Sequence, residues 1–311
     1  MAEIEIAVII TLLASGLGLS TPLLFAALGE KISERAGVLN RGVEGMMIMG
    51  AFAGFIGAFI SGNIVIGFLF GILTGAVMAS LMAFLNVTLR TNQLVAGLAV
   101  WLLGLGLSAF LYRLAFGIGT APRVEPLASI NIPGFSDIPF VGPVLFNHDP
   151  LVYIGWAMVP ILYVIVFKTK IGLTLRTVGE NPRQADTQGI SVVRVRYYAV
   201  MIGGAMAGVA GAYLSLVMVG IFVEDMTGAR GWIAIALVIF GRWHPIGIMG
   251  ACVLFGMVDA LQFSLQAAGV QAPHQIMLML PYIMAIAVMA FTYKRTTQPA
   301  GIGQAYTREE K

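Results

Sequence analysis

Three polar residues stand inside an otherwise apolar stretch in the last quarter of the chain: Asp259, Gln262 and Gln266. Their spacing of three and seven residues places them on one face of a helix. A carboxylate and two amides on one face can hydrogen-bond the hydroxyl groups of a polar solute, which predicts the lining of a solute pathway. The alternative is an interhelical hydrogen-bond clamp, because a carboxylate inside a membrane has to face a partner, the bundle interior or water.

Four more polar residues are candidates for the same pathway. Asn40 and Glu44 lie in a glycine-interrupted stretch, and Asn92 and Gln93 precede another apolar run. Glu44 has a second interpretation, since a carboxylate in the first turn of a helix stabilises the positive end of the helix dipole. The sequence leaves both roles open.

Catalytic and cofactor motifs are absent from the sequence. No G-x-S-x-G or H-E-x-x-H motif occurs, and none of the lysines follows a glycine, as a phosphate-binding loop would require. His148, His244 and His274 are far apart, and Cys252 is the single cysteine, so neither a metal site nor a disulfide is expected. We expect a chain that is not an enzyme and that binds no cofactor or metal of its own.

The composition is typical of a protein with many membrane-spanning helices. Of the 311 residues, 59% are hydrophobic and 11% charged, with a mean hydropathy of +0.90, whereas soluble globular proteins have about 25% charged residues. The net charge of +3 comes from basic residues beside apolar runs. Membrane lipid is therefore an expected partner and nucleic acid is not.

Apolar stretches of membrane-spanning length predict about nine transmembrane helices. They cover residues 6–29, 43–60, 64–89, 94–116, 151–167, 197–219, 232–240 with its upstream flank, 246–268 and 276–293. Glu3 and Glu5 stand where a signal peptide would need basic residues, so the first stretch is expected to be retained. The fold class is therefore an all-α polytopic membrane protein, with a transmembrane domain over residues 1–296 and a tail over residues 297–311.

Two of these spans are irregular. Three glycines and two charged residues lie in residues 36–45, at the start of the second span, and six polar or glycine residues lie in residues 224–231, before the seventh. Short or Gly-interrupted spans in corresponding positions of two halves indicate the broken helices of an inverted-repeat transporter. We expect two broken or short spans and an inverted repeat.

Small residues recur at every fourth position in two other spans. They are Gly67, Gly71 and Gly75 in the third span, and Gly204, Gly208 and Ala212 in the sixth. This spacing puts each set on one helix face, where two backbones can approach closely in lipid. The pattern favours helix packing over a part in transport.

Basic residues give the expected orientation. Residues 168–196 carry six Lys and Arg against Glu180 and Asp186, and a positive loop between two spans stays on the cytoplasmic side. Alternation then makes residues 30–41, 90–93, 241–245 and the tail cytoplasmic, and leaves the N-terminus outside. The long external loop, about 117–150, holds six of the 13 prolines, which predicts a stiff cap that either closes the outer mouth or receives a soluble partner.

The basic loop 168–196 contains a helix signal of its own. Asn181 is a good N-cap, Pro182 favours a first helical position, and Gly189 ends a helix. A short helix over about 182–188 is therefore expected. It is either a knob for the groove of a partner or part of a connector that only sets topology.

Residues 32–47, ISERAGVLNRGVEGMM, resemble the signature of permease subunits of ATP-binding-cassette importers. The branch is that of simple sugars and nucleosides within the branched-chain amino acid/ribose permease family. The resemblance continues through residues 172–190, 207–212 and 231–241, and it covers nearly the whole chain. The form Asn-Arg-Gly-Val-Glu-Gly is closer to nucleoside permeases than to those for ribose or galactose.

This resemblance implies a multi-pass permease of a bacterial-type plasma (inner) membrane that translocates a nucleoside or simple sugar and has no ATPase site. It implies three protein partners: a cytoplasmic ATP-binding subunit that uses the ATP, a second permease subunit, the same or paralogous, and an extracytoplasmic solute-binding protein. A rival from another class is a proton-coupled secondary transporter of a polar solute that uses Asp259.

The resemblance also assigns the coupling to the ATP-binding subunit. The residues concerned are Glu180, Asn181, Pro182, Ala185, Asp186 and Gly189. The sequence departs from the family at Ala185-Asp186, where two alanines are common, so individual contacts there stay open.

Overall fold

The computed structural model describes residues 2–117, 122–131, 133–267, 274–292 and 298–307, most of them in helices. The helices are α1 (Ala2–Arg35), α2 (Val43–Ser61), α3 (Ile64–Ala83), α4 (Gln93–Phe116), α5 (Val141–Leu145), α6 (Pro150–Lys168), α7 (Lys170–Glu180), α8 (Pro182–Thr187), α9 (Val192–Tyr213), α10 (Arg230–Phe240), α11 (Pro245–Ala267) and α12 (His274–Thr292). Two π-helical turns, η1 (Phe84–Thr88) and η2 (Leu214–Val219), continue α3 and α9. The prediction of a helical polytopic chain is confirmed.

Seven helices among the described residues are long and apolar enough to cross a membrane: α1, α2, α3 with η1, α4, α6, α9 with η2, and α11. The seventh predicted span contains only α10, whose 11 residues extend about 16 Å at about 1.5 Å per residue. That length is about half of a hydrocarbon core of about 30 Å. The ninth predicted span coincides with α12. The total of nine spans and the inverted repeat stay predictions.

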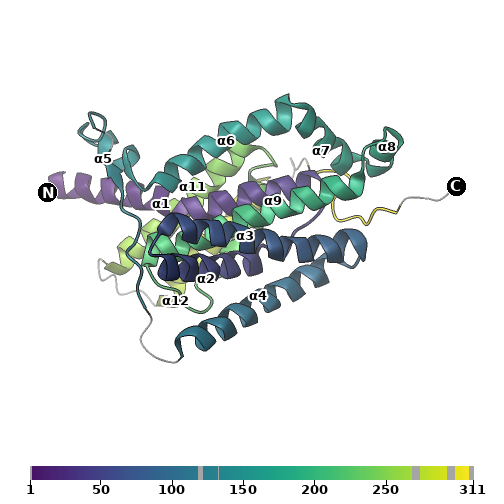
Figure 1. The fold of residues 1–311 in the computed structure, drawn as a ribbon. Coiled ribbons are helices and arrows are strands. Elements are labelled where there is room, and N and C mark those ends of the chain that lie inside the picture. The colour runs from purple at the N-terminus through teal and green to yellow at the C-terminus, as the bar shows by residue number, and fades with distance from the viewer. Residues whose placement is uncertain (1, 118–121, 132, 268–273, 293–297, 308–311) are drawn as a thin grey trace.

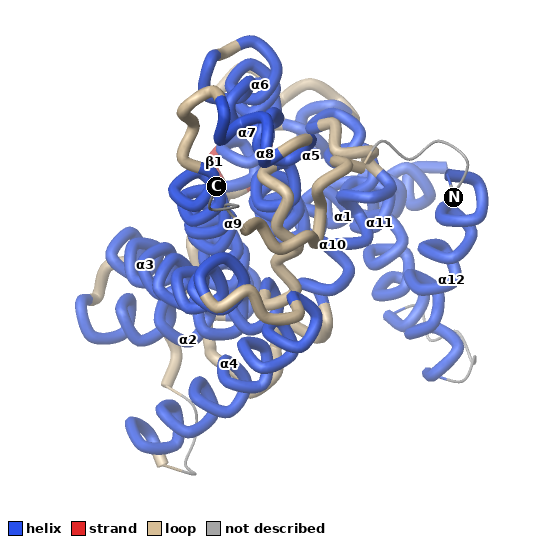
Figure 2. Tube along the Cα trace, turned by 90° about the vertical axis from the view of Figure 1, so that its right-hand side faces the viewer, coloured by secondary structure: helices blue, strands red, loops and turns tan. Residues whose placement is uncertain are grey.

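The long helices run side by side and define two ends of a bundle (Figure 1). The start of α1 and the short α5 lie at one end, which we call the α5 end. The helices α7 and α8 and the C-terminus lie at the other, which we call the α8 end. Viewed along the bundle, α4 and α12 lie at the periphery and α10 lies between them (Figure 2).

Close backbone contacts hold α2, α3 and α9 together. A Cβ added at Gly71 would lie 3.1 Å from the carbonyl oxygen of Gly208 and 3.2 Å from that of Gly50. Lipid tails provide no hydrophobic drive between helices, so such contacts stabilise the bundle through dispersion instead. The predicted packing role of the small residues in α3 and α9 is confirmed at these positions.

The first connection is shorter than the predicted loop over residues 30–41. The helix α1 continues to Arg35, and its last two turns bury Glu30, Lys31 and Glu34. The prediction was wrong because it took the charges as a sign of solvent. Other segments hydrogen-bond to Glu30 and Glu34, and Lys31 Nζ lies 5.4 Å from the ring centroid of Phe167. Glu30 Oε1, for example, accepts a hydrogen bond from the backbone N–H of Asn40 at 2.9 Å.

The basic loop 168–196 holds two helices rather than the single one predicted. The expected helix is α8: Asn181 Oδ1 accepts the N–H of Gln184 at 3.1 Å, and Gly189 adopts a φ of 79° after the helix. The helix α7 was missed, because Gly172 and Gly179 argue against a helix there. Both glycines lie inside it, and Gly179 packs so closely on Arg35 that a Cβ would collide with the Arg35 carbonyl.

The loop expected over residues 117–150 forms a small folded cap at the α5 end. Its strands β1 (Ile130–Asn131) and β2 (Asn147–His148) pair antiparallel, and α5 lies just before β2. Asp149 then caps α6 by accepting the N–H of Leu151 at 3.0 Å. The stiffness predicted from proline therefore has further support from paired strands and a capped helix; residues 118–121 and 132 lie outside the described ranges.

Candidate functional site

A cavity of about 210 Å³ lies between α10, α11 and α12. Its lining residues are Gly228, Arg230, Ile233, Phe255, Asp259, Gln262, Phe263, Gln266, Pro281 and Tyr282. The three polar residues predicted to share one face of a helix therefore open into one cavity. They share it with Arg230 at the start of α10 and with three aromatic rings.

Two polar groups of this cavity have no hydrogen-bond partner among the described residues. Gln266 Nε2 is buried without a hydrogen-bond partner among the described residues. The Asp259 carboxylate likewise makes no hydrogen bond or ion pair with any residue in the described ranges. Buried polar groups usually have partners, and a clamp would require one. Among the described residues, neither the Asp259 carboxylate nor the Gln266 amide nitrogen therefore has the partner that a clamp would need.

Glu44 joins the first turns of two helices. It is the second residue of α2, and its side chain is buried. Its two carboxylate oxygens accept the backbone N–H groups of Ala229, at 3.0 Å, and of Gly231, at 2.5 Å, at the start of α10. The first N–H groups of a helix have no intrahelical acceptor and carry partial positive charge. The Glu44 carboxylate therefore accepts the hydrogen bonds of the first N–H groups of α10 and also lies at the positive end of the α2 dipole.

This junction lies deep in the bundle. Gly45 packs on Gly104, which is midway along α4: a Cβ at Gly104 would lie 2.7 Å from the Gly45 Cα. Trp232 in α10 meets Trp101 of α4 edge to face, with ring centroids 6.0 Å apart. From this depth α10 runs to the α8 end. It is a half-helix that starts inside the bundle beside the cavity, as a short seventh span predicts.

The other three pathway candidates lie away from the cavity. Asn92 caps α4 by accepting the N–H of Leu94 at 2.9 Å, and Gln93 Oε1 accepts the N–H of Leu39 at 2.8 Å. Asn40 is fully buried and is held by Glu30. The side chains of Asn92 and Gln93 thus hold backbone groups at the α8 end, and Asn40 is held there through its backbone N–H. The structure does not bring any of the three to Asp259.

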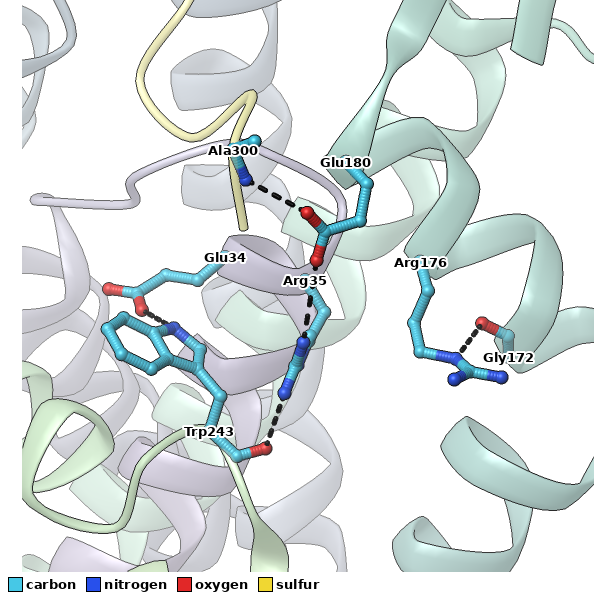
Figure 3. A network of polar contacts seen from close by, with 7 residues as sticks. All are labelled: Glu34, Arg35, Gly172, Arg176, Glu180, Trp243 and Ala300. Carbon is cyan, nitrogen blue, oxygen red and sulfur yellow. Dashed lines mark hydrogen bonds and ion pairs between the residues drawn. The ribbon is translucent and has the colours of Figure 1, made fainter. Parts of the chain in front are cut away.

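A polar network at the α8 end connects segments that are far apart in sequence (Figure 3). Arg35 Nη1 lies 4.0 Å from Glu180 Oε1, and Arg35 Nη2 donates to the carbonyl of Trp243 at 3.5 Å. The Trp243 indole N–H donates to Glu34. Ala300 N donates to Glu180 Oε2 at 3.1 Å. The end of α1 is thereby linked to α7, to the turn before α11 and to the C-terminal segment.

The residues assigned to coupling lie in and around α8 at this end, with Glu180 and Gly189 exposed. Glu180 ends α7, and Pro182 begins α8 after the Asn181 cap. Ala185 is buried against Val178 and Val192 and ties α8 to the bundle, whereas open space surrounds the position of a Cβ at Gly189. The structure thus presents one short helix at the surface, with Ala185 packed against the bundle.

Two titratable groups outside the spans have shifted pKa values. At the α5 end, two hydrogen bonds from Arg113, at 2.7 and 2.9 Å, lower the pKa of Glu224. At the α8 end, burial lowers the pKa of His244 below its ordinary 6.5, and the positive charges of Lys31 and Arg35 add to this effect. Within the described ranges, no three His, Cys, Asp or Glu come together as a metal site.

Sequence reasoning missed several of these residues. Arg230 was noted only as part of an irregular stretch, although a cation beside an apolar run is itself a signal of a polar cavity. Trp243 carried no signal, because its partner Glu34 is remote in sequence. The C-terminal segment near Ala300 was expected to be a simple tail.

Comparison with known proteins gives a family match over residues 12–289, to the family described as branched-chain amino acid transport system / permease component. A provisionally assigned glucose ABC transporter permease protein of Haloferax volcanii is 40% identical over 93% of this chain and 95% of its own length. A guanosine ABC transporter permease protein of Bacillus subtilis is 33% identical, and a nucleoside ABC transporter permease protein of Lactococcus lactis is 35% identical; each alignment covers 94% of this chain and 95% of the relative.

Proposed function

This chain belongs to the branched-chain amino acid transport system permease family, and on that premise we propose that it translocates a nucleoside or simple sugar as the membrane subunit of an ATP-binding-cassette importer. The named relatives carry such solutes or are assigned to do so. The energy comes from a separate cytoplasmic ATP-binding subunit.

The observation that carries the solute class is the cavity at the start of α10. Asp259 offers acceptors and Gln266 a donor that no described residue uses, and the positive charge of Arg230 acts on Asp259 without a direct ion pair. The rings of Phe255, Phe263 and Tyr282 supply apolar faces. Hydroxyl-rich, uncharged solutes with flat rings or pyranose faces suit such a lining, because they need both hydrogen-bond partners and aromatic surface.

The half-helix α10 supports a transport role for this region. Helices that break inside a bundle place their termini and irregular backbone beside solute sites in other transporters. Here the break of α10 is stabilised by Glu44, and the cavity begins at Arg230, the first residue of α10. Movement of α10 relative to α11 would change the width of the cavity directly.

The partners follow from the two ends of the bundle. The α8 end carries most of the basic residues of residues 168–196 and is the cytoplasmic end in this proposal. The ATP-binding subunit docks there on α8, and ATP binding changes the spacing of the docked subunits and so rocks the helices between two states. The cap at the α5 end faces a solute-binding protein, and a second permease subunit completes the pathway.

The test is uptake by proteoliposomes that contain the permease, the ATP-binding subunit and the binding protein encoded beside it. Radiolabelled guanosine and glucose are compared as solutes. Asp259→Asn should lower uptake at least about tenfold, because one lost charge-assisted hydrogen bond is worth about 1.5–3 kcal/mol. Its thermal unfolding midpoint should stay unchanged, whereas a lowered midpoint with normal uptake would identify a clamp.

A further inference from the structure

Residues 299–307, in the last described segment, lie across the α8 end, and we call them the strap. Its backbone is hydrogen-bonded to two different connections. Gly301 N donates to Gly179 O at 2.9 Å, and Gly303 N donates to Gly37 O at 3.1 Å. The strap therefore joins the end of α7 to the loop between α1 and α2.

The strap is also bound by a side chain of the coupling region. Ala300 N donates to Glu180 Oε2 at 3.1 Å, and the other oxygen of Glu180 lies 4.0 Å from Arg35 Nη1 (Figure 3). Glu180 thus lies between the strap and α1. A change in the position of α7 would therefore move the Glu180 contacts with both the strap and α1.

Arg196 anchors the strap to the spans. Its side chain is buried in α9, its Nη1 donates to the carbonyl of Gln304 at 2.9 Å, and its Nε donates to the carbonyl of Ala36 at 3.2 Å. Burying a guanidinium costs several kcal/mol unless it is hydrogen-bonded, so this cation depends on the strap for part of its satisfaction. The strap is therefore hydrogen-bonded into the structure of the α8 end.

The fit between strap and bundle requires glycine at two positions. A Cβ at Gly301 would lie 2.7 Å from the carbonyl oxygen of Gly179, and a Cβ at Gly37 would lie 3.1 Å from the carbonyl oxygen of Gly301. Gly37 also has a φ of 85°, which favours glycine.

The strap supports the short helix α8. Six residues are far too few for a stable isolated helix, since even good helix formers need about 12–15. The small apolar cluster of Val178, Ala185 and Val192 holds α8, and Tyr306 of the strap packs against it. A helix that transmits force has to be held firmly, and the strap supplies part of that hold.

The strap and α8 share an exposed surface. A polar notch of about 350 Å³ lies between Glu180–Arg183 on one side and strap residues on the other, among them Ala300, Gln304 and Ala305. Gln304 and Ala305 are exposed, as is Arg183. Any protein that grips α8 would meet the strap in the same contact.

We infer that the strap is part of the docking surface for the ATP-binding subunit and moves with α7 and α8 as one unit. This inference rests on the proposed function, which supplies the partner. The surface it adds is uncharged and is presented beside the basic side chain of Arg183. Because Glu180 lines the same notch, the two charges oppose each other and the partner is expected to place a polar, uncharged side chain there.

The experiment measures the affinity of the detergent-solubilised permease for the ATP-binding subunit encoded beside it. Ala305→Arg adds bulk and charge at the exposed rim of the notch without touching the anchors of the strap. It should weaken binding by at least about tenfold, which corresponds to about 1.4 kcal/mol. The matched control is Ala128→Arg, the same change at an exposed alanine of the α5 end, which should bind like the wild type.

A truncation after residue 298 should likewise lose binding, and a truncation after residue 307, which keeps the strap, should not. If Ala305→Arg binds within roughly twofold of the wild type, the inference is overturned. If the chain truncated after residue 298 does not fold, the affinity of Ala305→Arg alone decides whether the inference holds. Replacement of α8 by a Gly-Ser linker separates the two proposals. If the linker variant loses binding while the strap variants bind normally, the strap inference fails and the proposed function stands. If the wild type itself does not bind the ATP-binding subunit, both proposals fail.

Discussion

The buried carboxylate of Glu44 gives the sharpest prediction about the architecture. Glu44→Gln keeps the shape of the side chain but leaves one oxygen where two N–H groups, of Ala229 and Gly231, now point. Each hydrogen bond to a charged group contributes about 1.5–3 kcal/mol. The interaction of the carboxylate with the helix dipoles of α2 and α10 contributes at most about 2 kcal/mol more. Since Gln retains one acceptor, we expect a loss of about 2–4 kcal/mol in the free energy of unfolding.

Thermal unfolding in detergent, followed by tryptophan fluorescence, measures this loss. At about 2 °C or slightly more per kcal/mol for a chain of this size, the midpoint should fall by roughly 5–10 °C. Glu125→Gln, the same change on an exposed residue of the α5 end, is the matched control and should shift the midpoint by about 1 °C or less. A Glu44→Gln variant that unfolds with the wild type would refute the argument that this carboxylate stabilises two helix termini.

Two further predictions concern packing and pH. Gly208→Ala should destabilise the bundle by about 1–3 kcal/mol, because the new methyl group meets the Gly71 carbonyl. The control Gly106→Ala, in open space on α4, should be neutral or stabilising by up to about 1 kcal/mol. Equal unfolding midpoints for the two variants would contradict this prediction. His244 has a lowered pKa in the folded state, so the unfolded state binds its proton first as pH falls below 6.5, and stability should decline from pH 7.5 to 5.5. His244→Gln should flatten that decline, and an unchanged slope would count against the assignment.

Hydrophobic length predicted most of the fold. Runs such as residues 64–89 and 94–116 have one structural solution in lipid, because every backbone polar group has to be bonded within the segment. The spacing of Asp259 with two glutamines likewise predicted that the three share one helix face, and in the structure they line one cavity. In these cases the local sequence pattern was sufficient to predict the structure.

The remaining features depend on partners that are remote in sequence. Glu30 and Glu34 were assigned to a loop, and they are buried in α1 because Asn40 and Trp243 hydrogen-bond to them. Gly179 lies in a helix because Arg35 has to pass close to it. No local pattern encodes such contacts, so the predicted loop was too long and α7 was missed.

The candidate site divides in the same way. The α11 face was found because its polar residues interrupt an apolar helix. Arg230 was not, since its place beside Asp259 depends on how α10 starts at Glu44. The strap escaped prediction because its hydrogen bonds come mainly from backbone groups, which every residue type possesses.

The most direct measurement of the central claim is solute uptake by proteoliposomes that contain this chain with and without its ATP-binding subunit. The account predicts uptake against a gradient only when the ATP-binding subunit and ATP are both present, and none from a pH gradient alone. Concentrative uptake by the chain alone, driven by a pH gradient and abolished by Asp259→Asn, would contradict it and would identify a proton-coupled carrier.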